Sequence, residues 1–373
     1  MLRNDSQPIK RVLITGATGY LGNHLVKSFI EDGTFKIRAT TTNLIDHIKM
    51  EGLNALIGEK RDQLKKNGML EVIKLDLLNT SEVEAAVRGC DIVVHSATPT
   101  PLGVIKDAAQ QEQLMSNILL AMKNILKAVR NQGVKRLVLT SSTTCVIDKV
   151  KHKGTKSLVN EDDWADETVA ENIYTKVKVL QEKMAWEDYR RGGFELAVIC
   201  PGNMVGPSLK RDNYASAYGI KTILDWSKIP GFGFPQVFGQ FVDVRDAAKA
   251  HLLAAKNPSA NGKRFLIVSE GLWTVEIASF LFDEFGEYYK IKNRKLRFPF
   301  VIPLLAPISS RVASLKTRLG PRITCDTTAS KEILGLQYRP IRQAVTEMFY
   351  CMVEVGYVQN RLPPHMRDNR PKL

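Results

Sequence analysis

Short apolar runs alternate with amphipathic segments along the N-terminal part of the chain. Runs of four to six apolar residues are typical of strands buried on both faces, and apolar residues on one helical face are typical of covering helices. The pattern predicts strands at residues 11–15, 35–41, 70–76, 91–97, 136–141 and 194–200, and helices at 20–32, 108–131 and 172–191. Because crossovers between parallel strands are right-handed, this order predicts an α/β fold with a doubly wound parallel sheet.

After Pro201 the pattern becomes less regular. Glycine, proline and aromatic residues are frequent over 201–241, and the remaining apolar segments predict strands at 241–243 and 264–268 and helices at 245–255, 273–285, 302–317 and 340–356. We therefore expect a sheet domain over 1–205, with 241–256 packing back onto it, and a smaller, interleaved lobe over 206–373. Residues 44–69 predict an additional polar helical segment to which the sequence assigns no role.

Composition argues against several classes of protein. No apolar run reaches the roughly 18 residues of a membrane span, and the nearest one, Phe298–Ile308, carries three prolines and predicts a docked loop or short helix. The net charge is +14, but the basic residues are scattered and do not alternate with aromatic residues as in a nucleic-acid groove. A basic surface, or attraction of small anionic ligands, is the expected consequence.

Cysteine and histidine usage narrows the expected environment. Five cysteines without paired spacing argue against a disulfide framework, and Cys90, Cys145 and Cys200 are expected to pack at the edges of apolar strands. The beginning of the chain has no apolar segment typical of a signal peptide, so the cytoplasm is the expected compartment. Six scattered histidines predict no metal site.

The first predicted strand leads into a glycine-rich turn. In "VLITGATGYLG", Gly16 permits a tight turn, Gly19 allows the backbone to approach a pyrophosphate, and Gly22 allows the following helix to pack closely. The helix N-terminus then presents free N–H groups to phosphates. The position of this turn predicts a dinucleotide site.

The spacing G-x-x-G-x-x-G resembles that of the extended short-chain dehydrogenase/reductase family over residues 11–255. "HSATP" and "VLTSS" are most similar to its dihydroflavonol reductase, cinnamoyl-CoA reductase and methylglyoxal/aldehyde reductase branch. The resemblance implies that residues 1–205 bind the dinucleotide and 206–373 the substrate. It assigns cofactor contacts beyond the three glycines to Thr18, Tyr20, Leu21, Asp76, Leu77, Ser96, Ala97, Thr98, Pro201 and Met204.

The end of the second strand favours NADP(H) over NAD(H). An acidic residue there would bind the ribose hydroxyls of NAD, whereas basic and hydroxyl residues accommodate a 2′-phosphate. No acid lies at this strand end, and the residues that follow or flank it are Arg38, Thr41, Thr42, Asn43 and Lys49. The related plant reductases carry Arg in place of Thr42, so Arg38 or Lys49 would have to supply the missing cation.

Tyr174 and Lys178 form a Y-x-x-x-K pair on one face of a predicted helix. A phenol with a pKa near 10 is a poor acid or base at neutral pH, and a nearby ammonium lowers that pKa. Lysine can also hold the nicotinamide ribose. The second match, Tyr288 and Lys292, lies beyond the sheet in a basic stretch and is not expected to be catalytic.

Five hydroxyl residues, 140–144, follow the fifth strand at the edge of the sheet where ligands bind in doubly wound folds. By the family pattern Ser142 holds the substrate oxygen beside Tyr174, with Ser141 and Thr143 as alternatives. The resemblance also implies that Asn117 belongs to a proton relay. His251 is expected to pack in a helix that covers the sheet.

These residues together predict an NADPH-dependent reductase of a small-molecule aldehyde or ketone. The cinnamoyl-CoA signature "NWYCY" is replaced by "NIYTK", which argues against a CoA thioester as substrate. A sugar-nucleotide epimerase or hydroxysteroid dehydrogenase on the same scaffold, and a non-enzymatic NADP-binding sensor, remain open alternatives. The identity of the carbonyl or alcohol substrate and the oligomeric state, including a homodimer, also remain open.

Overall fold

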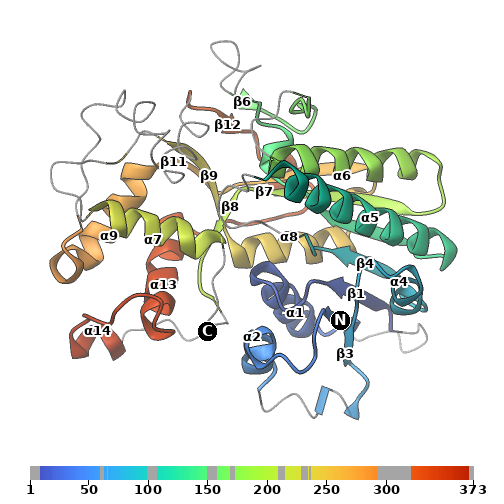
Figure 1. Cartoon of the computed structure of the whole chain (residues 1–373), viewed down its shortest axis with the longest axis horizontal. Helices are drawn as coiled ribbons and strands as arrows, with labels where there is room; N and C mark the ends of the chain where they lie inside the picture. The colour runs from blue at the N-terminus through green and yellow to red at the C-terminus, as the bar shows by residue number, and fades with distance from the viewer. Residues whose placement is uncertain are drawn as a thin grey trace.

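The computed structural model describes residues 9–58, 63–64, 66–98, 107–148, 158–168, 173–208, 215–227, 234, 237–291 and 321–368. A seven-stranded parallel sheet forms its centre (Figure 1). The strands are β1 (Arg11–Thr15), β2 (Lys36–Thr41), β3 (Leu70–Lys74), β4 (Ile92–His95), β5 (Arg136–Thr140), β7 (Glu195–Pro201) and β10 (Lys263–Ile267). Their order, β10-β7-β5-β4-β1-β2-β3, is doubly wound, which confirms the predicted fold class.

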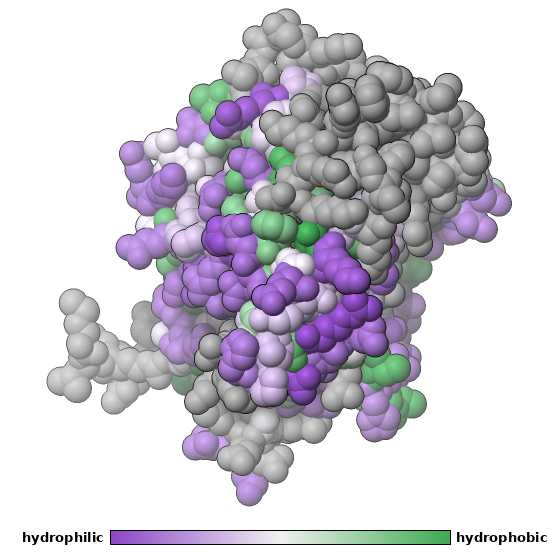
Figure 2. Space-filling model, turned by 90° about the vertical axis from the view of Figure 1, so that its left-hand side faces the viewer, coloured by the Kyte–Doolittle hydropathy of each residue, from purple (hydrophilic) through white to green (hydrophobic). Residues whose placement is uncertain are grey.

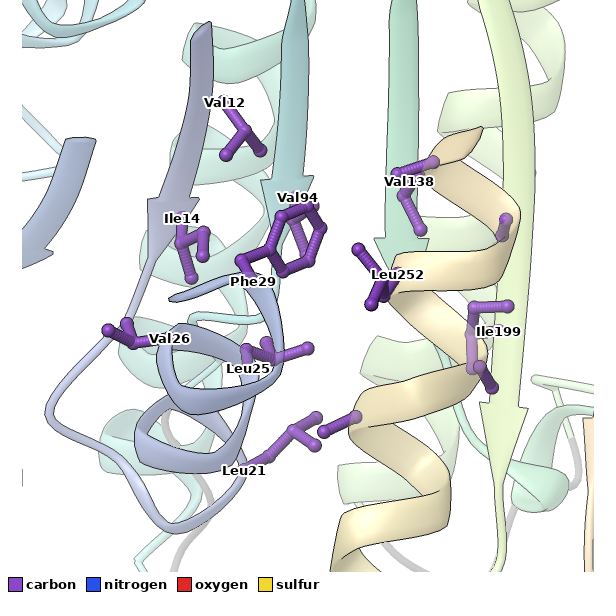
Figure 3. Packing of buried hydrophobic residues seen from close by; sticks show 14 of the residues in the cluster. Val12, Ile14, Leu21, Leu25, Val26, Phe29, Val94, Val138, Ile199 and Leu252 are labelled. Carbon is purple, nitrogen blue, oxygen red and sulfur yellow. The ribbon is translucent and has the colours of Figure 1, made fainter. Parts of the chain in front are cut away.

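Helices cover both faces of the sheet. α1 (Tyr20–Asp32), α2 (His47–Ile57) and α8 (Val244–Lys256) contribute to one hydrophobic core, and α4 (Thr80–Val87), α5 (Ala108–Asn131) and α6 (Ile173–Arg190) to the other. Figure 3 shows Phe29 and Leu25 of α1 and Leu252 of α8 against Val94, Val138 and Ile199 of the sheet. The sequence analysis missed α4, a helix of eight residues with only three buried side chains.

A smaller lobe lies beside the carboxyl end of the sheet (Figure 1). It contains a three-stranded sheet of β8 (Asn203–Val205), β9 (Phe238–Asp243) and β11 (Glu270–Trp273). The helices α7 (Ala215–Ser227), α9 (Thr274–Tyr289) and α13 (Ile341–Glu354) share a separate hydrophobic core with it. The predicted helix at 302–317 and the segment Phe298–Ile308 lie outside the described residues. The division of the chain at residue 205 stays a prediction.

The remaining elements are short. β6 (Leu158–Val159) pairs with β12 (Thr324–Cys325), and the helical turns are η1 (Thr143–Cys145), η2 (Pro258–Ala260), α12 (Thr328–Glu332) and α14 (Pro364–Asp368). Only α2 and a few neighbouring residues of the predicted segment 44–69 are described as helix.

Ion pairs anchor the lobe to the sheet domain. Arg245, in the first turn of α8, binds both carboxylate oxygens of Asp243 at 2.9 and 2.6 Å and reaches Glu347 of α13 at 2.5 Å. Asp243 is fully buried and caps α8 by accepting from the backbone N–H of Arg245. Leaving a buried charge unpaired is unfavourable, so these three residues hold α13 against the first turn of α8.

The described surface is mainly hydrophilic on the side shown in Figure 2, where hydrophobic residues appear in small separate areas. No helix in the described part of the chain has the length and apolar character needed to cross a membrane. All five cysteines are free thiols, and Cys90, Cys145 and Cys200 are buried as expected.

Candidate active site

The glycine turn has the geometry that a phosphate-binding turn requires. Gly16 adopts a φ of 70°, which glycine tolerates best, and a Cβ there would lie 3.0 Å from Cα of Ala97. A Cβ on Gly22 would lie 1.9 Å from the carbonyl oxygen of Gly16, so any side chain would separate α1 from the turn. Around Gly19 the only close atom is that same oxygen, at 3.2 Å.

The N-terminus of α1 is suited to an anion. Gly19 is the N-cap residue, no side chain caps the helix, and its first turn contains no acidic residue. The partial positive charge of the helix end is therefore not neutralised by the protein's own side chains. Thr18 lies within 3.5 Å of Thr41 through their hydroxyl groups, and Leu21 is buried under the turn. This cradle fits the diphosphate of a dinucleotide.

The residues expected at the adenine end divide into two groups. Lys49 Nζ donates to the Thr42 hydroxyl at 3.1 Å, and both side chains are accessible, so this pair can meet a 2′-phosphate. The Thr41 hydroxyl and the Asn43 backbone hydrogen-bond to each other within the same turn. Asp46 does not approach the strand end, because it caps α2.

Arg38, a candidate for the phosphate contact, makes structural hydrogen bonds instead. Its guanidinium donates to Glu71 at 2.9 Å and to the carbonyl oxygens of Ala86 and Arg88 at 2.7 and 2.9 Å. These bonds tie β2 to β3 and to the end of α4. The guanidinium of Arg38 is held by these acceptors, whereas Lys49 is the candidate cation that bonds to Thr42.

The other expected cofactor residues lie at the carboxyl ends of β1, β3, β4 and β7. The hydroxyl of Ser96 donates to the carbonyl oxygen of Thr15 at 2.7 Å, which joins the ends of β1 and β4 beside Gly16. Asp76 accepts from the backbone N–H of Leu78, and the carbonyl of Leu77 accepts from Asn124. Ala97 and Thr98 follow β4, Pro201 ends β7, and Met204 lies in β8 of the three-stranded sheet.

Two hydrogen bonds join the glycine-turn helix to the loop after β8. The hydroxyl of Tyr20 donates to the carbonyl oxygen of Gly206 at 2.8 Å, and Nε2 of His24 lies 2.9 Å from the carbonyl oxygen of Pro207. Burial lowers the pKa of His24 to about 4, so its ring is neutral at physiological pH. Tyr20 thus bonds to the residue that directly follows β8, the strand that contains Met204.

The side chains of Tyr174 and Ser142 lie together. Their side chains are hydrogen-bonded to each other, and the Ser142 Oγ also accepts from the backbone N–H of Thr144 at 3.2 Å. Ser142 is buried, whereas Tyr174 is partly exposed. Burial raises the pKa of Tyr174 to about 12, and the bond to Ser142 opposes this shift. The phenol is therefore protonated across the neutral range.

Two other residues of the hydroxyl run, Thr140 and Ser141, bond to buried side chains. Thr140 bonds to Nε2 of His251 at 2.7 Å, while Ser141 donates to Glu182 at 2.5 Å. His251 also bonds the carbonyl of Ala247, so its ring packs within the core as expected. Ser141, an alternative to Ser142, is thus held away from a substrate by Glu182.

Lys178 lies one helical turn after Tyr174 and is 3% exposed. Its ammonium donates to the carbonyl oxygen of Thr140 at 2.9 Å, to the Thr98 hydroxyl at 3.1 Å and to Oε1 of Gln181 at 3.4 Å. Burial lowers its pKa to about 8, against the opposing influence of Cys145, Glu182 and Cys200. In this arrangement the ammonium bonds to neutral oxygens, and it is not among the groups that shift the pKa of Tyr174.

Asn117 does not join this group. Its side-chain oxygen accepts from Nε2 of Gln113 at 2.8 Å on the same helix, and none of the three bonds of Lys178 goes to it. Sequence reasoning missed Gln181, although its position three residues after Lys178 places it on the same helical face. Among the described residues, no cluster of three or more potential ligands could hold a metal ion.

Comparisons with known proteins agree with this geometry. A family model described as "NAD dependent epimerase/dehydratase family" matches residues 12–267. Cinnamoyl-CoA reductase 2 of Arabidopsis thaliana is 29% identical over 363 residues, which cover 96% of this chain and 97% of the relative. Cinnamoyl-CoA reductase 1 of the same plant is 32% identical over 292 residues, covering 77% and 79%. The resemblance predicted from the sequence motifs is confirmed.

Solved structures share the fold. The crystal structure of yeast methylglyoxal/isovaleraldehyde reductase Gre2 complexed with NADPH has a TM-score of 0.73 at 22% identity and covers 93% of this chain and 99% of that one. Vestitone reductase from alfalfa (Medicago sativa) has a TM-score of 0.69 at 24% identity, with coverages of 93% and 99%.

Proposed function

We propose that this chain, which belongs to the NAD dependent epimerase/dehydratase family, is an NADPH-dependent reductase of a small-molecule aldehyde or ketone. The observation that carries the proposal is the hydrogen bond between Tyr174 and Ser142, with the ammonium of Lys178 one helical turn away. The names of the relatives, which include cinnamoyl-CoA reductases, support reductase chemistry.

The cofactor would be held by residues of this chain along the sheet edge. The turn from Gly16 to Gly22 would bind the diphosphate, Thr42 and Lys49 the phosphate on the adenosine ribose, and Lys178 the nicotinamide ribose. When bound, NADPH supplies the hydride. The absence of a free carboxylate at the end of β2 supports NADPH over NADH within the described residues.

The protein's own groups handle the substrate oxygen and its proton. Ser142 would hydrogen-bond the carbonyl oxygen, and Tyr174 would donate a proton to it as the alcohol forms. A phenol with a raised pKa is protonated at neutral pH, which suits a proton donor in reduction. Lys178 would have to release one of its present acceptors to reach the phenol or the ribose, and its ammonium would then favour the phenolate left after proton transfer.

The substrate class is proposed as a free carbonyl rather than a CoA thioester. The segment at Tyr174 reads "NIYTK" in place of the cinnamoyl-CoA signature, although cinnamoyl-CoA reductases are among the similar proteins. Comparing an aldehyde or ketone with its matching CoA thioester therefore tests the substrate class directly.

The experiment is to follow NADPH oxidation by absorbance over a panel of aldehydes, ketones and one cinnamoyl-CoA thioester, with NADH in parallel. Turnover of at least one free carbonyl is expected, and Tyr174→Phe should lower it by roughly 10²–10⁴-fold. Tyr288→Phe is the matched control, because Tyr288 belongs to the second Y-x-x-x-K match but packs in the lobe core.

Two outcomes would overturn the proposal. Tightly retained NAD without net turnover would indicate an epimerase. Nucleotide binding without turnover on any substrate, equally in wild type and Tyr174→Phe, would indicate a sensor.

A further inference from the structure

Gln181 is an unusual residue for its position. It is 2% exposed and lies on the face of α6 that carries Lys178, yet its Nε2 has no hydrogen-bond partner among the described residues. Burying an amide group without satisfying it is unfavourable, so packing alone would favour an apolar side chain here. Such a group calls for an explanation other than stability.

The oxygen of Gln181 has two donors, and both belong to the candidate active site. Oε1 accepts from the ammonium of Lys178 and from the hydroxyl of Thr98, each at 3.4 Å. The same ammonium also donates to Thr98, so the three side chains form a closed triangle of hydrogen bonds. Gln181 therefore contacts the ammonium directly and also contacts the hydroxyl that orients it.

The neighbouring carboxylate is engaged elsewhere. Glu182 follows Gln181 on α6, but it pairs with Arg264 at 2.6 Å and accepts from Ser141 and Trp186. The ammonium of Lys178 thus bonds to neutral acceptors. Gln181 is the acceptor whose side chain comes from the same helix, α6.

We propose that Gln181 is a positioning residue that holds the ammonium of Lys178 and sets the pH above which the reductase loses activity. This inference rests on the proposed function for its activity readout. A neutral oxygen stabilises the ammonium less than a carboxylate would and more than a methyl group would. The side chain at position 181 therefore tunes the protonation of Lys178 without fixing its charge.

The other titratable groups around Lys178 are Cys145 of η1, Cys200 of β7, Glu182 of α6, His95 of β4 and His251 of α8. Glu182 is paired with Arg264 at 2.6 Å. Burial raises the pKa of both thiols and lowers those of His95 and His251 to about 3 and 4, so all four are neutral. The buried residues of α5, which also packs on α6, include no ionisable group.

The test compares Gln181→Leu with Gln181→Glu. Leucine removes the acceptor, so the alkaline limb of kcat/KM should move about one pH unit downward; glutamate adds a charge, so it should move upward by a similar amount. The matched controls are Gln359→Leu and Gln359→Glu, at an exposed position in the segment between α13 and α14, where no shift is expected. The proposal would be overturned if the alkaline limb of kcat/KM moved in the same direction in both Gln181 variants. It would also be overturned if activity fell while the alkaline limb stayed at the same pH.

A second readout does not depend on activity. The folded pKa of Lys178, about 8, lies below the ordinary value of 10.5 for a lysine, and the acceptor at position 181 stabilises only the charged form. The stability that Gln181 contributes over Leu is therefore present at pH 6 and lost as pH rises through 8. In urea denaturation, the ratio of wild-type to Gln181→Leu unfolding constants should change about tenfold between pH 6 and 9.5.

The two readouts separate the two proposals. If no carbonyl is reduced but the unfolding ratio changes with pH as stated, the role of Gln181 stands and the proposed function fails. If the ratio is the same at both pH values, the role of Gln181 fails whatever the activity.

Discussion

One buried cation, Lys178, belongs to α6 and another, Arg264, contacts it. The two differ in how their charges are compensated. Arg264 of β10 pairs with Glu182 at 2.6 Å, stacks at 3.9 Å over the ring of Trp164 and donates to the carbonyl oxygens of Glu161 and Asp163. Lys178 is similarly buried, but its three bonds within the described part of the chain all go to neutral oxygens. The charge of Arg264 is compensated by a carboxylate, whereas that of Lys178 is not.

The difference appears in the pKa values of the two groups. Burial disfavours both charges, but around Arg264 the pairing with Glu182 helps to outweigh burial, and the pKa of Arg264 is raised. Around Lys178 burial prevails and lowers the pKa to about 8. A paired charge holds a fold in place, whereas an uncompensated charge near neutrality can exchange partners and protons. The comparison therefore indicates a structural role for Arg264 and supports the proposed chemical role of Lys178.

The largest effect is expected for Lys178→Met. Removing the ammonium should lower kcat/KM by roughly 10²–10⁴-fold, comparable to the loss of a group that assists proton transfer. The free energy of unfolding should change little, because methionine relieves the burial of an uncompensated charge. Steady-state kinetics and urea denaturation on the same protein preparation measure both; a large loss of stability would contradict the comparison.

The opposite pattern is expected for Arg264→Met. This change leaves Glu182 buried without its partner and should lower the free energy of unfolding by about 3–5 kcal/mol. The control is Arg191→Met, which breaks an exposed pair with Glu187 and should cost about 1 kcal/mol or less. Combining Arg264→Met with Glu182→Gln should recover part of the loss, and urea denaturation at pH 7 would reveal whether it does.

Lys49 is a third cation, exposed and bonded to the neutral Thr42. If it meets a phosphate, Lys49→Ala should raise the KM for NADPH about tenfold and leave the KM for NADH unchanged. Thr42→Arg, which restores the residue of related plant reductases, should lower the KM for NADPH. Equal changes for both nucleotides in either variant would rule out a phosphate contact.

The smallest effect is expected for Tyr20→Phe, which removes one hydrogen bond between uncharged groups. Losing the hydrogen bond to Gly206 should lower stability or cofactor affinity by about 1 kcal/mol, without moving the alkaline limb of kcat/KM. Isothermal titration with NADPH and a pH profile give both quantities. A shifted limb would show that the loop after β8 also affects Lys178.

Sequence reasoning predicted most of the fold because local patterns carry it. Continuous apolar runs marked six strands of the main sheet, and the helices 20–32 and 108–131 have the predicted bounds. The lobe was predicted less well, since β8 and β11 are strands of three and four residues without a periodic pattern long enough to recognise.

The chain alone determined the elements whose contacts are local: the turn through Gly16 and Gly22, and the spacing of Tyr174 and Lys178 on one helix. Only the tertiary structure decided which partners those side chains take. Arg38 binds Ala86, 48 residues away, and Arg264 binds Glu182, 82 residues away. Helical and strand periodicity orient a side chain along its own element, but its partner across the sheet depends on how separate elements pack.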